Sequence, residues 1–226
     1  MEKFNIYNVI IMDRSGSMSS IASSAISGFN ELLESVKKTQ AESSDTQNNL
    51  MSLVLFDSTS VDTLHWNSNP NKVEPLSHKT YVPGACTPLY DAMGITLSRL
   101  EKEIGDNKRD GVAVTIITDG YENSSHEFNL KTIASMVERL KEKGWTFAYM
   151  GTDHDVTAVT HTLKIDNAIM FDKSDEGTGA VFEAEREARR RWNAEYAACM
   201  YDECTMKEEE LLERKRRLAK EYFKKR

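Results

Sequence analysis

The chain of 226 residues has only three cysteines and no long apolar run. Cys86, Cys199 and Cys204 are too few and too scattered for a disulfide framework or a four-cysteine zinc site, so we expect free thiols. A membrane-spanning helix needs about 20 consecutive apolar residues, and no segment approaches that length. The first residues also lack the basic cluster and apolar stretch of a secretory signal. We therefore expect a cytoplasmic protein with no membrane segment.

Positive charge is also in short supply, and the deficit lies in the first three quarters of the chain. Residues 1–173 hold 16 Lys and Arg against 23 Asp and Glu, whereas residues 174–226 hold 13 of each. Because phosphate neutralisation supplies most of the affinity for duplex nucleic acid, we do not expect the acidic part to bind it. Its charge suits a cation or a basic partner surface. The last residues, 207–226, carry nine basic and five acidic side chains, which leaves RNA binding open for this end.

Up to about residue 173, strand-like and helix-like segments alternate. The apolar run at 112–117 is typical of a strand buried on both faces. We expect strands at about 6–12, 50–56, 61–66, 112–117, 145–150 and 168–171, and helices at about 19–39, 88–104, 128–143 and 155–163. Strands separated by helices predict an α/β fold, with a doubly wound, mostly parallel sheet and helices on both faces. Only four residues separate the strands at 50–56 and 61–66, so the latter should be an antiparallel edge strand.

Residues 174–226 are densely charged and favour helix, so we treat them as a C-terminal extension of a domain formed by 1–173. Residues 174–179 include two glycines and suggest a hinge. A first helix, at about 181–200, has enough apolar residues to pack on the domain. A second, at about 205–225, has an acidic start and a basic end, which suit the helix macrodipole. We expect this second helix to protrude or to mediate self-association.

Polar residues interrupt this pattern at three places. Asp13, Ser15 and Ser17 follow the first strand, Thr87 precedes a helix, and Asp119 follows the apolar strand at 112–117. In open α/β sheets, ligands bind at the carboxyl ends of the strands, where the strand order reverses. If these two strands are neighbours at that reversal, Asp13 and Asp119 meet there.

These five side chains offer only oxygen atoms, which suits Mg²⁺ or Mn²⁺ better than zinc or copper. The two carboxylates, Asp13 and Asp119, offset the charge of a divalent ion, and neutral hydroxyl groups add no further charge. Such an ion can accept one more acidic oxygen from outside. The pattern therefore predicts a site at which an Asp or Glu of a partner protein completes the coordination.

Each segment also has an ordinary structural interpretation. Ser17 or Ser19 could cap the first helix, and Thr87 before Pro88 has the pattern of a helix N-cap. Asp119 with the glycine that follows it fits a turn. The occurrence of all three segments beside the right elements favours the metal site.

Four further residues are weaker candidates for the rim of this site. Tyr121 and Glu122 follow Asp119, with an exposed loop as the alternative. Asp153 and His154 follow the strand at 145–150, with Asp153 as a helix N-cap and a solvated histidine as the favoured alternative.

Residues 5–172 resemble the von Willebrand factor type A (VWA) domain, also called the integrin I-like domain. The sequence Asp-Arg-Ser-Gly-Ser-Met at 13–18 looks like the metal-ion-dependent adhesion site (MIDAS) of that family. Thr87 and Asp119 match its metal-binding threonine and second aspartate. The resemblance implies a six-stranded, Rossmann-like sheet with one antiparallel edge strand, and a stand-alone protein of the bacterial or phage intracellular type. It also implies Mg²⁺, with Mn²⁺ or Ca²⁺ as alternatives, at Asp13, Ser15, Ser17, Thr87 and Asp119.

Three functions follow from these observations. The leading hypothesis is a protein-binding module that needs a divalent cation, acts as an adaptor in an intracellular assembly and has no catalytic residue. The second is a metal-assisted phosphoesterase at the same site. That chemistry usually needs a base beside the ion or a second metal, and no second cluster of carboxylates is evident. In the third, the C-terminal helices bind RNA or a helical partner and the VWA domain is a scaffold.

Overall fold

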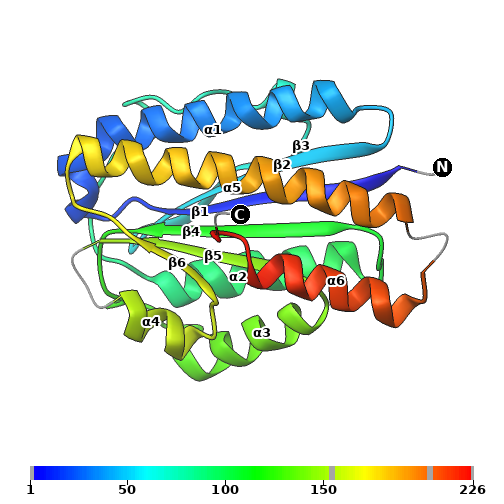
Figure 1. Ribbon diagram of the computed structural model, residues 1–226. Helices are drawn as coiled ribbons and strands as arrows, with labels where there is room; N and C mark the ends of the chain where they lie inside the picture. The colour runs from blue at the N-terminus through cyan, green and yellow to red at the C-terminus, as the bar shows by residue number, and fades with distance from the viewer. Residues whose placement is uncertain (1–2, 153–155, 203–205, 225–226) are drawn as a thin grey trace.

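Six strands form a single sheet in the order β3-β2-β1-β4-β5-β6 (Figure 1). The computed structural model describes residues 3–152, 156–202 and 206–224. The strands are β1 (Phe4–Asp13), β2 (Gln47–Asp57), β3 (Ser60–Ser68), β4 (Gly111–Thr118), β5 (Thr146–Gly151) and β6 (Asn167–Met170). The edge strand β3 runs antiparallel to β2, and all other neighbours are parallel. The predicted fold class is confirmed.

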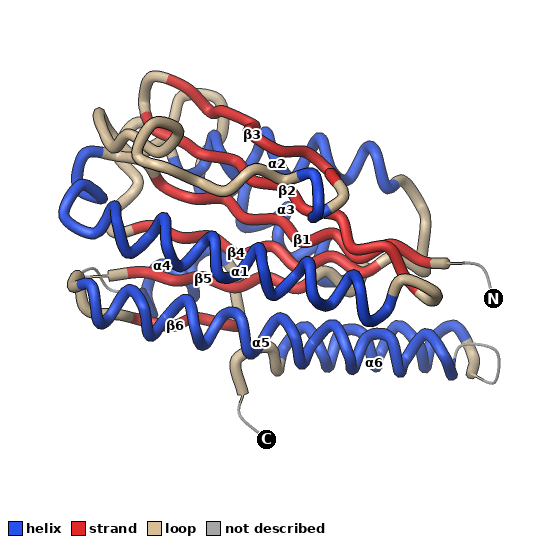
Figure 2. Tube along the Cα trace, turned by 90° about the horizontal axis from the view of Figure 1, so that it is seen from above, coloured by secondary structure: helices blue, strands red, loops and turns tan. Residues whose placement is uncertain are grey.

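Helices cover both faces of the sheet (Figures 1 and 2). One face packs against α2 (Leu89–Ile104), α3 (Leu130–Glu142) and α4 (Val156–Leu163). The other packs against α1 (Ala22–Ser43), α5 (Asp175–Tyr201) and α6 (Glu208–Lys220). Two short 3-10 helices, η1 (Gly16–Ile21) and η2 (Pro70–Lys72), precede α1 and follow β3. In the described parts of the chain, no helix has both the length and the apolar character needed to cross a membrane.

The central strand β1 shows why its sequence is apolar at nearly every position. Val9 and Ile11 pack into the core beneath α2 and α3. Ile10 and Met12 point to the opposite face and pack against α1 and α5. Because successive side chains of a strand alternate between faces, a sheet covered on both sides needs apolar residues at both odd and even positions.

The strand order brings the two predicted carboxylates to the same edge. From β1 the chain first builds β2 and β3 on one side, and then β4, β5 and β6 on the other. The order therefore reverses between β1 and β4, which pair in parallel with Met12 opposite Ile117. Asp13 and Thr118, the next residues, are the last of these two strands. The expectation that these strands are neighbours at the reversal is confirmed.

The second C-terminal helix, α6, packs on the domain, so the expectation that it protrudes was wrong, whereas self-association through it stays a prediction. Leu211, Leu218 and Tyr222 are buried in a cluster that includes Trp192 of α5 and Ala113 of β4. The apolar stripe of α6 is thin, but it lies over small side chains of the sheet and beside the aromatic residues of α5. A thin stripe is therefore enough to dock this helix.

The predicted hinge at 174–179 is the start of α5 instead. Ser174 is the N-cap, and its side chain accepts a 3.0 Å hydrogen bond from the backbone N–H of Gly177. A Cβ atom on Gly177 would lie 2.3 Å from the carbonyl oxygen of Asp172, so this glycine permits a close backbone approach. The change at residue 173 is one of composition, and as a domain boundary it stays a prediction.

Two charged side chains of α5 are buried against the sheet. Arg189 forms a 2.8 Å ion pair with Glu185, and both side chains are almost fully buried. Arg189 also donates hydrogen bonds to Asn8 of β1 and Thr115 of β4. A buried charge is tolerated when it is paired and hydrogen-bonded, so these polar contacts fix the position of α5 on the sheet.

Candidate functional site

Asp13 is the last residue of β1, and its carboxylate is buried and held from two directions. The backbone N–H of Ser15 donates to Oδ1 at 2.6 Å, and Thr118 Oγ1 donates to Oδ2 at 2.6 Å. The Tyr81 hydroxyl donates to the backbone carbonyl of Asp13 at 2.6 Å. Burial raises the pKa of Asp13 to about 6, against the opposing effect of the hydrogen bonds from Thr118 and Ser15. The carboxylate therefore has a fixed orientation.

The two serines of the 13–17 segment connect Asp13 with Asp119. Ser15 Oγ lies 3.1 Å from Ser17 Oγ, and Ser17 Oγ donates to Asp119 Oδ1 at 2.5 Å. Thr87 lies at the same place: a Cβ atom built on Gly120 would be 3.7 Å from Thr87 Oγ1 and 3.8 Å from Ser17 Oγ. All five predicted ligands thus converge at the carboxyl ends of β1 and β4. Ser17 is exposed, so the group opens to solvent on its side.

Backbone hydrogen bonds position the loop that carries Thr87 against the 13–17 segment. Gly16 N–H donates to the carbonyl of Ala85 at 3.1 Å, and Gly84 N–H donates to that of Arg14 at 2.9 Å. The Arg14 side chain bonds to Asp57 at the end of β2, at 2.8 Å. Arg14 therefore anchors the loop to the neighbouring strand.

The N-cap interpretation of Thr87 is wrong, because the N-cap of α2 is Pro88 and no side chain of that residue caps the helix. Side chains of the loop after β4 instead accept hydrogen bonds from the backbone N–H groups in the first turn of α2. Tyr90 N–H donates to Glu122 Oε2 at 3.0 Å, and Asp91 N–H donates to Ser125 Oγ at 3.1 Å. The Thr87 hydroxyl instead lies near Gly120, 3.7 Å from where a Cβ atom on that glycine would be.

The weaker rim candidates have different positions. Glu122 lies beside the site, but its carboxylate accepts hydrogen bonds from Tyr90, Ser124 and Ser125 and closes its own loop. The Tyr121 side chain is 57% exposed, next to Asp119. Asp153 and His154 lie outside the described residues. Hydrogen bonding thus gives Glu122 a structural role, whereas Tyr121 is exposed and its place on the rim stays a prediction.

Sequence reasoning did not identify Lys173, which follows β6 and pairs with the second aspartate. Its Nζ lies 2.5 Å from Asp119 Oδ2, and the Asp119 side chain is fully buried. Among the described residues, no hydrogen-bond donor satisfies Oδ2, so its interaction with the Lys173 ammonium is an ion pair. The only sequence signal is the place of Lys173 just beyond the carboxyl end of a strand. Thr118 and Tyr81, which hold Asp13, were also missed.

The arrangement of oxygen atoms fits a small divalent cation. Octahedral Mg²⁺ binds its ligands at about 2.1 Å, which places neighbouring ligand oxygens about 3 Å apart. The oxygens of Ser15 and Ser17 lie 3.1 Å apart, and those of Ser17 and Asp119 lie 2.5 Å apart. Among the described residues, no three His, Cys, Asp or Glu side chains form a metal-binding group. A cation at this point would therefore depend on hydroxyl groups in addition to its two carboxylates.

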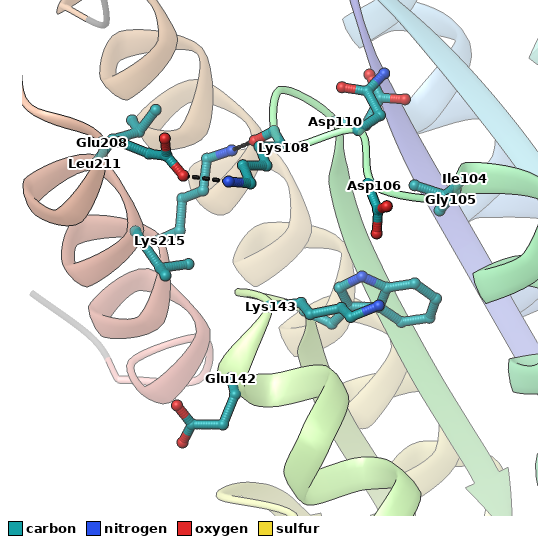
Figure 3. Close-up of a pocket in the computed structure, with 13 residues that line it drawn as sticks. Ile104, Gly105, Asp106, Lys108, Asp110, Glu142, Lys143, Glu208, Leu211 and Lys215 are labelled. Carbon is teal, nitrogen blue, oxygen red and sulfur yellow. Dashed lines mark hydrogen bonds and ion pairs between the residues drawn. The ribbon is translucent and has the colours of Figure 1, made fainter.

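A separate cavity of about 480 Å³ lies at the opposite end of the sheet (Figure 3). The connection before β4, the end of α3 and the start of α6 surround it. Lysines and carboxylates mix on its walls, and its three lysines are all engaged: Lys108 with Glu208, Lys143 with Glu101, and Lys215 with the carbonyl of Lys108. This mixed lining defines no ligand class.

The model of the von Willebrand factor type A domain matches residues 8–122, about half of the chain. This range includes Asp13, Ser15, Ser17, Thr87 and Asp119. The chain therefore belongs to the VWA family, whose members often mediate protein–protein interactions. A comparison with curated proteins gives no match.

Solved structures with the same fold include a pilus adhesin, the VWA domain of SpRpn10 and a protein of the mussel byssus. The pilus adhesin SpaC from Lactobacillus rhamnosus GG, in an open conformation, has a TM-score of 0.56 and 14% identity, over 84% of this chain and 30% of SpaC. The SpRpn10 VWA domain has a TM-score of 0.50 and 10% identity, over 81% of this chain and 95% of that domain. Proximal thread matrix protein 1 from the mussel byssus has a TM-score of 0.52 and 11% identity, over 80% of this chain and 45% of that protein. The matched region spans less than half of the first and third proteins, and the likeness shows the fold alone.

Proposed function

We propose that this VWA domain binds a protein partner through a divalent cation, Mg²⁺ or Mn²⁺. The observation that carries the proposal is the convergence of five oxygen-bearing side chains where the strand order reverses. Asp13, Ser15, Ser17, Thr87 and Asp119 would hold the ion, directly or through water. The cation would supply an electrophilic position that a carboxylate oxygen can occupy.

The charge of the site favours an acidic group of the partner. Two carboxylates, Asp13 and Asp119, compensate a divalent ion, and the three hydroxyl ligands contribute no charge. An Asp or Glu side chain from a partner protein could then complete the coordination. In keeping with this role, we propose an adaptor in a larger assembly, with a cytoplasmic location as a further prediction.

We also propose that the chain is not an enzyme. The acidic side chains that flank the site in sequence are engaged in structural hydrogen bonds. Asp91 accepts from the backbone N–H groups of His126, Glu127 and Phe128, and Glu122 accepts from its own loop and from α2. Neither is poised as a general base, which hydrolysis at a metal usually requires. Turnover of a generic phosphoester with Mn²⁺, lost in Asp13→Asn, would contradict this part.

Two neighbouring serines of η1 allow a matched test of cation binding. Ser17 belongs to the proposed ligand set, whereas Ser19 Oγ donates to the carbonyl of Gly16 and lies outside it. Both are exposed. We expect Ser17→Ala to weaken Mn²⁺ binding at least about tenfold in a calorimetric titration, since one ligand is lost. Ser19→Ala should bind as the wild type does, and equal affinity in both variants would contradict the ligand assignment.

The role of the cation in recognition needs a separate measurement. Partner proteins captured from a lysate of the source cells should be released by EDTA and retained in Mg²⁺. The Ser17→Ala variant should lose the same proteins at equal Mg²⁺. If EDTA leaves the captured set unchanged, the cation plays no part in recognition even where it binds.

A further inference from the structure

Lys173 places a positive charge inside the proposed cation site. It lies between β6 and α5, and its Nζ is 2.5 Å from Asp119 Oδ2. Strand β5 separates β6 from β4, so the side chain reaches across the carboxyl end of β5. The Asp119 side chain is fully buried, whereas that of Lys173 is 24% exposed and has a route to solvent. A flexible, partly exposed lysine can therefore approach or leave this carboxylate.

The backbone around Lys173 fixes where its side chain begins. Phe171 N–H donates to the carbonyl of Gly151 at the end of β5, at 3.0 Å. Ser174 caps α5, and the close approach of Gly177 to Asp172 shapes the turn. The backbone is thus fixed on both sides of Lys173, and this turn directs the side chain toward Asp119.

The charges nearby leave Lys173 to balance the buried carboxylates. Asp13 and Asp119 are both buried; burial raises the pKa of the neighbouring Tyr81 phenol, and the charges of these two carboxylates raise it further. Arg14, a cation within the 13–17 segment, forms ion pairs with Asp57 and Asp62 instead. Among the described residues, Lys173 is thus the cation paired with Asp119.

We propose that Lys173 is a built-in competitor of the divalent cation for Asp119. This inference rests on the proposed cation site. An ammonium at one carboxylate oxygen repels a divalent ion bound a few ångströms away, so the lysine must withdraw or the ion binds more weakly. Either way, Lys173 lowers the affinity for the cation and stabilises the cation-free protein. The partner's carboxylate is then bound only when the cation concentration is high enough to displace the lysine.

The test compares Lys173→Met with Lys37→Met. Lys37 is a matched control, because it is 23% exposed and forms a 2.8 Å ion pair, with Glu34 of α1. We expect Lys173→Met to bind Mn²⁺ at least about tenfold more tightly than the wild type in a calorimetric titration. Lys173→Arg keeps the charge and should not gain affinity. Lys37→Met should match the wild type.

Thermal melting gives a readout without the cation. In EDTA, Lys173→Met leaves a buried carboxylate uncompensated, so its melting temperature should fall by about 2–4 °C relative to the wild type. Saturating Mn²⁺ should reverse this order. A purely structural lysine would instead lower the melting temperature equally in EDTA and in Mn²⁺.

The outcomes separate this inference from the proposed function. If the wild type binds Mn²⁺ and Lys173→Met binds it equally or more weakly, competition by Lys173 is refuted and the cation site stands. If neither protein binds Mn²⁺, both proposals fail. Binding by Lys173→Met alone would show that the lysine excludes the ion, which supports the inference in its strongest form.

Discussion

Thr118, the last residue of β4, donates a 2.6 Å hydrogen bond to Oδ2 of Asp13, the last residue of β1. Both side chains are fully buried. The bond joins the two strands at the reversal of strand order and orients the carboxylate that leads the proposed cation site. Loss of a hydrogen bond that orients a metal ligand typically lowers the affinity for the metal by about 10–100-fold.

Thr118→Val removes this hydrogen bond with little change in shape. We expect Mn²⁺ affinity to fall about tenfold, since partners of metal ligands typically contribute that much. Thr96→Val is the control, because the buried hydroxyl of Thr96 has no hydrogen-bond partner in the described structure. Thr96→Val should leave the affinity unchanged and preserve or raise stability. Calorimetry on both variants decides the matter, and an unaltered affinity in Thr118→Val would show that Asp13 needs no such orientation.

Two helical glycines should respond in opposite ways to alanine. A Cβ atom on Gly28 of α1 would lie 2.3 Å from the ring of Phe182 on α5, whereas one on Gly179 of α5 would meet nothing within 4 Å. Gly28→Ala should therefore lower the free energy of unfolding by about 1–3 kcal/mol through overpacking. Gly179→Ala should raise it by about 0.5–1 kcal/mol, because alanine favours the helix. Urea unfolding measures both, and a tolerated Gly28→Ala would mean that α1 and α5 can separate.

Much of the fold could be predicted because its signals are local. The apolar face of α1 and the continuous apolar run of β4 are visible in single segments, and both are buried as expected. The meeting of Asp13 and Asp119 was predictable too, since the carboxyl ends of parallel strands lie at one edge. The rule that ligand-binding residues gather where the strand order reverses was therefore enough to place both aspartates.

Contacts between side chains that lie far apart in the sequence left no comparable local pattern. Lys173 is one more lysine in the sequence, and its role follows from a side chain that crosses the end of β5. Glu122 looked like a rim ligand but satisfies the start of α2, 32 residues away in sequence. The docking of α6 depends on the small residues Ala113 and Ala148 beneath it. Neither composition nor periodicity encodes such pairings.

The docking of α6 predicts unequal roles for two of its leucines. Leu218 is 6% exposed and packs in the cluster beneath α6, whereas Leu212 is partly exposed beside the cavity of Figure 3. Leu218→Ala should lower the free energy of unfolding by about 2–3 kcal/mol, since it opens a buried void. Leu212→Ala should cost less than about 1 kcal/mol. Chemical denaturation of both variants tests this, and equal small losses would indicate that α6 detaches readily in solution.

Glu101 makes stability depend on pH in a predictable direction. This residue near the end of α2 is paired with Arg139 and Lys143, and hydrogen bonding to Arg139 is the main reason that its pKa falls to about 2. Because the folded pKa lies below the ordinary value of 4.5, the charged pair stabilises the fold above about pH 4.5. This contribution is lost as the pH falls toward 2. Both basic partners are about half exposed, so screening by solvent limits it to about 1 kcal/mol.

The matched variant is Glu101→Gln, which keeps the size of the side chain and removes its titration. Its deficit in unfolding free energy relative to the wild type should be constant between pH 7 and pH 5 and should shrink between pH 4.5 and pH 3, as the wild-type carboxylate takes up a proton. Urea midpoints at pH 7, 5, 4 and 3 measure this difference. Glu42→Gln on α1 is the control, because Glu42 is exposed, lies 3.9 Å from the exposed Lys38 and should show a smaller deficit. A deficit for Glu101→Gln that persists undiminished at pH 3 would mean that packing, and not charge, joins α2 to α3 at this point.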